Sequence, residues 1–128
     1  MSSMTGVVGS PYVATYGSAK AYILALGSAL AYELRDSGVD VMTLVPGAVN
    51  TETYRRAQKD DVSSFPPMEV PIFVNDALAA LGSEMVHVPG RQSALTMVAL
   101  GRLLPRRVAV RLMGRSLEKL INPIDAAS

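Results

Sequence analysis

The sequence predicts an α/β fold, because a long helical pattern leads through a glycine turn into a short and almost wholly apolar segment. Apolar residues recur at steps of three and four from Tyr12 to Asp36, which indicates a helix, and Gly38 follows its end. Residues 39–45 are rich in β-branched side chains and stop at Pro46-Gly47, which is typical of a buried strand. A helix, a turn and a buried strand in this order make one unit of an α/β sheet.

The second half of the chain continues this alternation. Residues 47–71 are polar and contain prolines, which predicts a long excursion of the kind that is usually functional or mobile. Helical spacing returns over 73–81, and residues 85–88 predict a short final strand. The tail 94–121 is helical by composition, with Pro105 placed to begin a second helix.

Composition excludes several classes of function. The net charge of +1 gives no overall attraction to nucleic acid. The chain has no cysteine, which excludes disulfides and thiol nucleophiles, and its single histidine, His87, is expected to be structural, so we predict no metal site. The sequence shows neither a signal peptide nor a long apolar membrane span, so we expect a cytoplasmic protein.

Tyr16 and Lys20 are the first candidates for chemistry. Their spacing of four residues places them on one face of the predicted helix, near its start. A neighbouring ammonium stabilises a phenolate, so the pair suits general acid/base work. The spacing alone is weak evidence, because many helices carry Tyr and Lys at this distance without any such role.

Two further motifs strengthen the evidence that Tyr16 and Lys20 have a catalytic role. The segment Ser3-Met4-Thr5-Gly6 places a serine thirteen residues before Tyr16, and the predicted strand ends in Pro46-Gly47 with Thr51 four residues beyond the glycine. Together with Tyr16-Gly17-Ser18-Ala19-Lys20, these segments resemble the short-chain dehydrogenase/reductase family in order, spacing and element type over residues 1–90. The resemblance implies the C-terminal part of a doubly wound Rossmann-type parallel sheet.

The resemblance also implies roles for individual residues. Ser3 would hydrogen-bond the substrate oxygen, Tyr16 would give or take a proton on that oxygen, and Lys20 would hold the ribose of NAD or NADP. The Pro46-Gly47 turn, with the backbone near Val49 and the hydroxyl of Thr51, would face the nicotinamide. The implied function is hydride transfer between a nicotinamide cofactor and a ketone or secondary alcohol.

Alternatives remain open at three of these sites. Ser2 competes with Ser3 for the catalytic role, and either is otherwise a plain loop serine. Pro46-Gly47 also fits a simple strand terminator. Thr51 also fits the N-cap of a short helix over 51–58, a use that threonine favours and that is compatible with a cofactor contact.

The family's glycine-rich dinucleotide turn and its middle-strand Asn-Ala-Gly segment have no counterpart in the sequence. We therefore expect the N-terminal dinucleotide-binding half to be missing, and the chain to be a fragment that is inactive by itself. Residues 1–90 would form the catalytic half, with 47–71 as a substrate lid, and residues 91–128 a helical extension.

The tail combines leucines with arginines in a basic amphipathic pattern, which is typical either of a helix packed on its own protein or of one that contacts a membrane surface. It resembles the C-terminal extension of hydroxysteroid and long-chain 3-oxoacyl reductases, which implies a lipophilic substrate. The competing prediction is an inactive dimerisation or scaffold fragment, because in the family the helix corresponding to Tyr12–Asp36 packs against its copy in a homo-oligomer.

Overall fold

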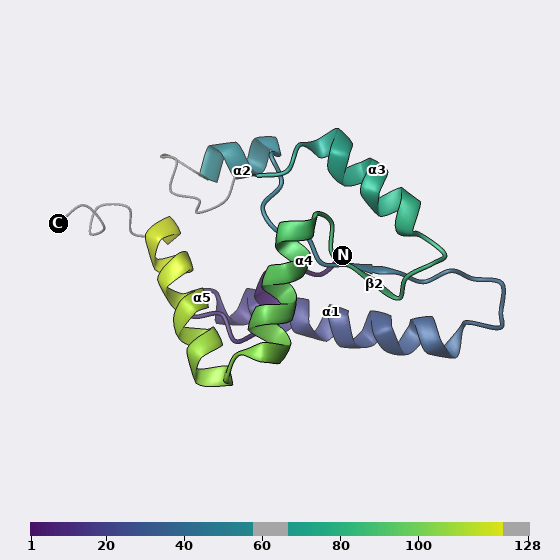
Figure 1. Cartoon of the computed structure of the whole chain (residues 1–128), viewed down its shortest axis with the longest axis horizontal. Coiled ribbons are helices and arrows are strands. Elements are labelled where there is room, and N and C mark those ends of the chain that lie inside the picture. Colours follow the sequence, from purple (N-terminus) through teal and green to yellow (C-terminus); the bar gives the residue numbers. More distant parts are fainter. Residues whose placement is uncertain (58–66, 122–128) are drawn as a thin grey trace.

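The computed structural model describes residues 1–57 and 67–121 (Figure 1). The elements follow one another in the order 3₁₀ turn Met4–Gly6, α1 (Ala14–Glu33), β1 (Thr43–Leu44), α2 (Glu52–Ala57), α3 (Val70–Ala80), β2 (Val86–His87), α4 (Arg91–Val98), π-helical turn Ala99–Leu103 and α5 (Arg106–Ile121). This arrangement confirms the predicted α/β class.

The two strands form a small parallel sheet. Thr43 lies opposite Val86, and Leu44 lies opposite His87. On the other edge of β1, the amide of Ser2 donates to the carbonyl oxygen of Leu44 at 2.7 Å. The chain before the 3₁₀ turn therefore runs beside β1 in the place of a third strand, so that β1 has backbone partners on both edges.

Helices cover both faces of this sheet. In Figure 1, α1 and α3 lie on opposite sides of the strands, while α4 stands beside α1. The buried apolar residues are mostly small and come from several parts of the fold: Val45, Ala77, Ala80, Ala109 and Met113. Because Val45 is fully buried and directly precedes Pro46-Gly47, the end of β1 is a well-packed support for that turn.

The predicted helix over Tyr12–Asp36 is too long at both ends. Tyr12 has a φ of 67°, in the left-handed region, so that α1 begins only after Val13. At the other end Leu34 caps the helix, and Gly38 makes the turn toward β1 with a φ of 76°.

The predicted strand over 39–45 is also too long. Only Thr43–Leu44 pair as a strand with β2, and Val39 is 54% exposed. The apolar run is therefore exposed at its start and buried only at its C-terminal end, although β-branched residues occur along its whole length. The short strand predicted over 85–88 is confirmed, with pairing confined to Val86–His87.

The helices of the second half begin earlier than predicted. α3 starts at Val70, with Pro71 in its first turn, and α4 starts at Arg91 after Gly90 with a φ of 83°. The break at Pro105 is confirmed, because a π-helical turn ends before it and α5 begins directly after it.

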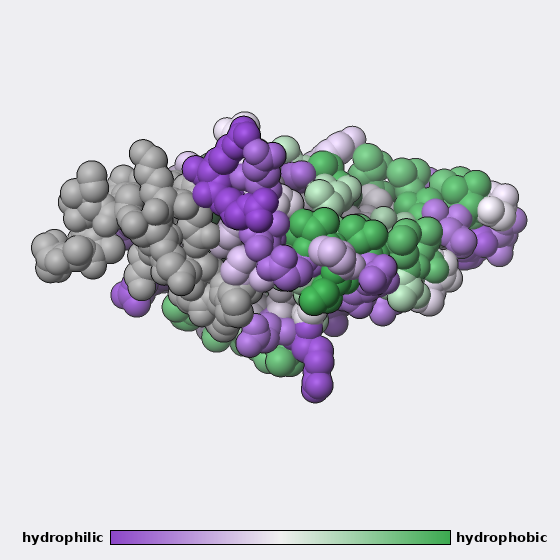
Figure 2. Space-filling view, turned by 90° about the horizontal axis from the view of Figure 1, so that it is seen from above, coloured by the Kyte–Doolittle hydropathy of each residue, from purple (hydrophilic) through white to green (hydrophobic). Residues whose placement is uncertain are grey.

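Large apolar side chains remain exposed on several helices, among them α1 and α3. Tyr22, Leu26 and Tyr32 are exposed on α1. Ile72, Val74 and Leu78 are exposed on α3, and Figure 2 shows hydrophobic surface gathered on that side of the molecule. Within residues 1–57 and 67–121, no helix is both long and apolar enough to cross a membrane.

Candidate active site

The 3₁₀ turn packs directly against the middle of α1. The buried Oγ of Ser2 donates a hydrogen bond of 2.7 Å to the carbonyl oxygen of Lys20. A Cβ built on Gly6 would lie 2.7 Å from the carbonyl carbon of Lys20 and 2.8 Å from the amide nitrogen of Ala21. Only a glycine allows this approach of two backbones, which brings the segment containing Ser3 to the helix that carries Tyr16 and Lys20.

Ser2 and Ser3 have different environments. Ser2 is 1% exposed and its hydroxyl is committed to a backbone carbonyl group, so it serves as an anchor. Ser3 is half-buried, and its Oγ accepts hydrogen bonds from the amide (3.3 Å) and the hydroxyl (3.1 Å) of Thr5. Because both lone pairs of Oγ accept hydrogen bonds, the O–H group of Ser3 is left to donate one. It can therefore donate to a substrate oxygen.

Tyr16 and Lys20 lie next to each other on α1. The Nζ of Lys20 is 5.3 Å from the centroid of the Tyr16 ring and donates to the carbonyl oxygen of Met1 at 3.3 Å. Tyr16 is 51% exposed, which leaves its hydroxyl accessible. The pair therefore combines an open phenol with a cation held in place from two sides.

Close packing explains why the residue after Tyr16 is a glycine. Gly17 is buried, and a Cβ at this position would lie 3.0 Å from the carbonyl oxygen of Thr5. That same oxygen accepts a hydrogen bond of 2.9 Å from the buried hydroxyl of Ser10. The loop between the 3₁₀ turn and α1 is thus folded back onto the first turn of the helix.

The Pro46-Gly47 turn lies between the 3₁₀ turn and α4. The amide of Met4 donates to the carbonyl oxygen of Pro46 at 3.2 Å, and a Cβ on Gly47 would lie 2.6 Å from the Oγ of Ser93. The glycine therefore allows the N-terminal turn of α4 to reach this edge of the site. A simple strand terminator does not need such a contact.

Val49 and Thr51 stand at the start of the predicted lid. Val49 forms a parallel bridge with Met68, and the amide of Met68 donates to the carbonyl oxygen of Ala48 at 2.9 Å. The Oγ1 of Thr51 accepts from the amide of Tyr54 at 3.1 Å, which confirms the N-cap expected there. Residues 58–66 of the lid lie outside the described residues. The catalytic and cofactor-binding roles of all seven candidates, Ser3, Tyr16, Lys20, Pro46, Gly47, Val49 and Thr51, stay predictions.

Three contributors to the site were not found from the sequence. Thr5 holds the hydroxyl of Ser3, Ser10 holds the loop, and Ser93 packs on Gly47. Thr5 lies inside the segment Ser3-Met4-Thr5-Gly6, where a hydroxyl close to Ser3 is a usable signal, and Ser10 lies in the loop between that segment and Tyr16. Ser93 carries no such signal, because its contact depends on how α4 returns to the sheet.

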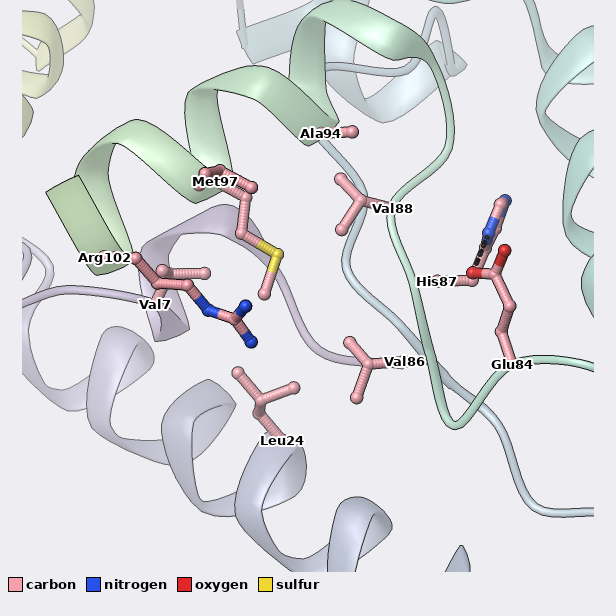
Figure 3. A pocket seen from close by; sticks show the side chains of 11 residues that line it. Val7, Leu24, Glu84, Val86, His87, Val88, Ala94, Met97 and Arg102 are labelled. Atoms are coloured by element: carbon pink, nitrogen blue, oxygen red, sulfur yellow. Dashed lines mark hydrogen bonds and ion pairs between the residues drawn. The ribbon is translucent and has the colours of Figure 1, made fainter.

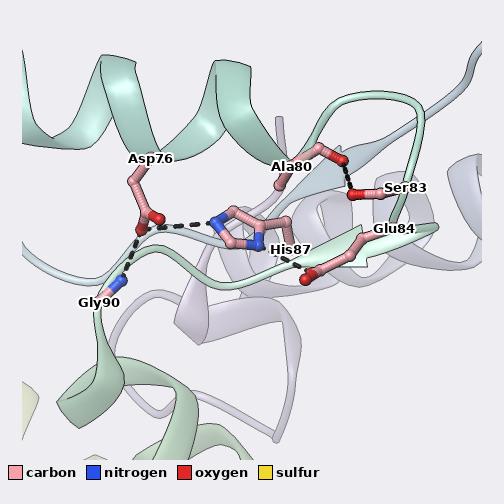
Figure 4. Close-up of polar contacts among 6 residues, drawn as sticks. All are labelled: Asp76, Ala80, Ser83, Glu84, His87 and Gly90. Atoms are coloured by element: carbon pink, nitrogen blue, oxygen red, sulfur yellow. Dashed lines mark hydrogen bonds and ion pairs between the residues drawn. The ribbon is translucent and has the colours of Figure 1, made fainter.

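A second polar cluster surrounds His87 on the α3 face of β2 (Figure 4). The Nδ1 of His87 is 2.8 Å from Oε2 of Glu84, and its Nε2 is 3.4 Å from Oδ2 of Asp76 without hydrogen-bond geometry. Asp76 also accepts from the amide of Gly90 at 3.1 Å. The expectation that His87 is structural agrees with this arrangement, since it connects α3 to both ends of β2. The structure contains no cluster of three or more metal-ligating side chains in its described residues.

The basic tail packs on the loop that precedes α1. A Cβ on Gly114 would lie 3.2 Å from Cγ of Pro11, and one on Gly9 would lie 3.4 Å from Cγ2 of Val110. Ala109 and Met113 are buried, while the arginines of α5 point outward and are exposed: Arg106, Arg107, Arg111 and Arg115. A helix packed on its own protein accounts for this pattern, and contact with a membrane stays a prediction.

Comparison with known proteins connects these features. Residues 1–62 match the model of the short chain dehydrogenase family. A very-long-chain 3-oxoacyl-CoA reductase of Neurospora crassa is 47% identical over 51 residues, which are 40% of this chain and 15% of that protein. A 7beta-hydroxysteroid dehydrogenase of Collinsella aerofaciens is 30% identical over 97 residues, 73% of this chain and 37% of that protein.

The fold comparison agrees with the sequence comparison. A solved structure of a 7beta-hydroxysteroid dehydrogenase superposes with a TM-score of 0.74 and 28% identity, over 88% of this chain and 43% of that one. The chain thus spans less than half the length of each of these relatives. Residues 1–62 therefore belong to the short-chain dehydrogenase family, and the fold comparison over 88% of the chain agrees with this assignment.

Proposed function

We propose that this chain supplies the proton-transfer machinery of an oxidoreductase that acts on a ketone or secondary alcohol. The observation that carries the proposal is the packing of the Ser3 segment on α1, fixed by the hydrogen bond from Ser2 to the carbonyl oxygen of Lys20. This packing brings the segment that carries the Ser3 hydroxyl to the helix that carries Tyr16 and Lys20, just beyond the carboxyl end of β1. Ligands of open α/β sheets bind at the carboxyl ends of the strands, which supports the proposal.

In reduction, the Tyr16 hydroxyl gives its proton to the substrate oxygen, and in oxidation Tyr16 receives it back. The Ser3 hydroxyl donates a hydrogen bond to the same oxygen and stabilises the negative charge that develops there. Lys20 lies beside the ring of Tyr16, where its charge stabilises the phenolate that remains after proton transfer.

The donor set fits the nicotinamide end of NAD or NADP. Lys20 would hold the ribose hydroxyls, while the Pro46-Gly47 turn, the backbone at Val49 and the hydroxyl of Thr51 would face the carboxamide. When bound, the cofactor supplies or accepts the hydride. No glycine-rich turn for the pyrophosphate exists in residues 1–128, so we propose that the chain acts only together with a dinucleotide-binding half and is inactive by itself.

The proposal extends to the class of substrate. Relatives named 7beta-hydroxysteroid dehydrogenase and very-long-chain 3-oxoacyl-CoA reductase support a lipophilic carbonyl compound. The two names differ in substrate shape, one a rigid steroid and the other a flexible acyl chain. A panel containing both kinds of carbonyl compound distinguishes them.

The experiment compares the chain alone with the chain fused behind the dinucleotide-binding half of a relative. We expect cofactor binding, followed by NADH or NADPH fluorescence, and hydride transfer in the fusion only. Tyr16→Phe in the fusion should keep cofactor binding and lower turnover about 100-fold or more. The matched control is Tyr22→Phe, another exposed tyrosine of α1. Clear activity of the unfused chain, or equal turnover of both variants, contradicts the proposal.

A second candidate function is homo-oligomerisation as a scaffold through α1. Its support is the exposure of three large apolar residues on this helix, Tyr22 (67%), Leu26 (42%) and Tyr32 (62%). Leu26→Glu should then turn a dimer into a monomer in analytical ultracentrifugation. A monomeric unsubstituted chain excludes this candidate and leaves the enzyme proposal untouched.

A further inference from the structure

A groove of about 500 Å³ lies between α1, β2 and α4 (Figure 3). Its volume falls in the range of about 300–1,000 Å³ that is usual for small-molecule pockets. Aliphatic side chains form most of its walls, among them Val7, Leu24, Val86, Val88, Met97 and Val98. Ser3, Tyr16 and Lys20 are not among the lining residues, so the groove is separate from the candidate active site.

The alternation of β2 separates this groove from the polar cluster behind the strand. Figure 3 shows the side chains of Val86 and Val88 on the side of Met97 and Leu24, whereas the ring of His87 points away. Glu84 also lines the groove, but its carboxylate contacts the Nδ1 of His87 at 2.8 Å. The carboxylate at this end is therefore already in contact with the His87 ring.

The opposite end of the groove carries a positive charge. In Figure 3 the guanidinium group of Arg102 extends from the π-helical turn toward Met97 and Leu24. Across the described residues, no carboxylate lies within ion-pair distance of Arg102. A guanidinium beside aliphatic walls favours an anion that approaches along those walls, because its forked donors match a carboxylate.

We propose that this groove binds a free aliphatic carboxylate. The carboxylate group contacts Arg102, and the chain lies along Leu24, Met97 and Val86. The aliphatic walls provide the hydrophobic contribution, which grows with each buried methylene group. The cation at one end fixes the direction of the ligand and discriminates against neutral and cationic head groups.

The test measures binding of decanoate to the full chain by calorimetry, below the critical micelle concentration so that free molecules and not a lipid surface are tested. Decanol and decyltrimethylammonium carry the same tail, and acetate carries only the head group. We expect decanoate to bind most tightly, decanol to bind more weakly, and acetate and the cation not to bind detectably. Added salt should weaken decanoate binding more than decanol binding.

Two pairs of variants localise the site. Arg102→Gln should weaken decanoate binding about fivefold to tenfold, whereas Arg106→Gln, at an exposed arginine outside the groove, should not. Val98→Glu places a carboxylate beside Arg102 and should abolish binding, whereas Leu95→Glu on the same helix should not. All four positions are exposed, so the variants should fold, which circular dichroism verifies.

Three results overturn the proposal. Decanol binding as tightly as decanoate removes the role of the cation. Equal affinities of the two arginine variants, or of the two glutamate variants, place the ligand elsewhere. Failure of the unsubstituted folded chain to bind decanoate removes the site itself, while the active-site proposal, which does not use this groove, remains.

Discussion

The hydroxyl of Ser2 donates a 2.7 Å hydrogen bond to the carbonyl oxygen of Lys20, across eighteen positions of sequence. Next to it, Ser3 keeps its proton for a ligand, because Thr5 occupies its acceptor sites. The two adjacent serines therefore have different roles: Ser2 anchors the segment to α1, and Ser3 is free to donate to a ligand.

This division predicts different effects of the two alanine substitutions. Ser2→Ala should lower the free energy of unfolding by about 1 kcal/mol, because a buried hydrogen bond is lost. Ser3→Ala should change stability less and lower turnover of the fused enzyme instead. Urea unfolding and steady-state kinetics on both variants measure the two effects. If Ser3→Ala lowers stability and Ser2→Ala lowers turnover instead, the anchor is Ser3.

Thr5 should act as a positioning residue for Ser3. Thr5→Val removes the hydroxyl that donates to the Ser3 Oγ at 3.1 Å while keeping the shape of the side chain. We expect kcat of the fused enzyme to fall about tenfold, KM to change little, and Thr5→Ser to restore most of the loss. No rescue by serine would point to a packing role for the methyl group.

The close approach at Gly6 predicts a strong steric effect. Gly6→Ala places a methyl group against the backbone of Lys20 and Ala21, which cannot move aside without shifting α1. Stability should fall by about 1–3 kcal/mol, as in other overpacked sites. Gly9→Ala is the matched control, because its methyl group would meet only a Val110 side chain at 3.4 Å. Similar unfolding curves for both variants would contradict the packing described here.

The contact between Tyr12 and Glu118 predicts a dependence on alkaline pH. The negative charge of Glu118, then its hydrogen bond and a small desolvation, raise the pKa of Tyr12 above its usual value near 10. A raised pKa means that the folded state holds the proton more tightly than the unfolded state. The contribution to stability is therefore complete below pH of about 10 and is lost as pH rises through the folded pKa.

Ring-labelled tyrosine NMR can follow this titration, and Glu118→Gln supplies the comparison. The Tyr12 signal should titrate at a higher pH in the unsubstituted chain than in the Glu118→Gln variant. The other tyrosines should titrate equally in both proteins. An unchanged Tyr12 curve would show that Glu118 does not contact this ring in solution.

The cluster at His87 predicts a local effect on stability. Asp76→Ala leaves the amide of Gly90 without its acceptor and Nε2 of His87 without its carboxylate, so we expect a loss of about 1 kcal/mol. Hydrogen exchange at Gly90 should become faster. The control is Asp36→Ala, whose ion pair with Arg35 is solvent-exposed and should contribute little. Equal effects of the two changes would contradict the role of this cluster in connecting α3 to the ends of β2.

The sequence predicted the order of elements because periodicity and turn residues act locally. It placed the helix of Tyr16 and Lys20, the break at Pro105 and the cap at Thr51, each of which depends on residues within about one helical turn. It misjudged the ends of α1 and β1, because composition does not show that Tyr12 adopts a positive φ or that Val39 is solvated.

The contacts that build the site could not be predicted from local sequence patterns. Ser2 with Lys20, Gly6 with Ala21, and Gly47 with Ser93 join segments that are far apart in sequence. The groove at Arg102 likewise exists only after α4 has returned beside α1. These relationships depend on tertiary geometry, and in a single sequence only the glycines point to them.

The parallel bridge between Val49 and Met68 ties together the two ends of the segment that follows β1. Ala48 and Asn50 both exchange backbone hydrogen bonds with Met68, at 2.9 and 2.8 Å, and the side-chain amide of Asn50 donates to Glu69 at 2.7 Å. When two chain positions are held together in this way, the stretch between them can change length at a small entropic cost. We therefore predict that exchange of residues 51–67, within the expected substrate lid, changes substrate preference while the path from β1 to α3 stays the same.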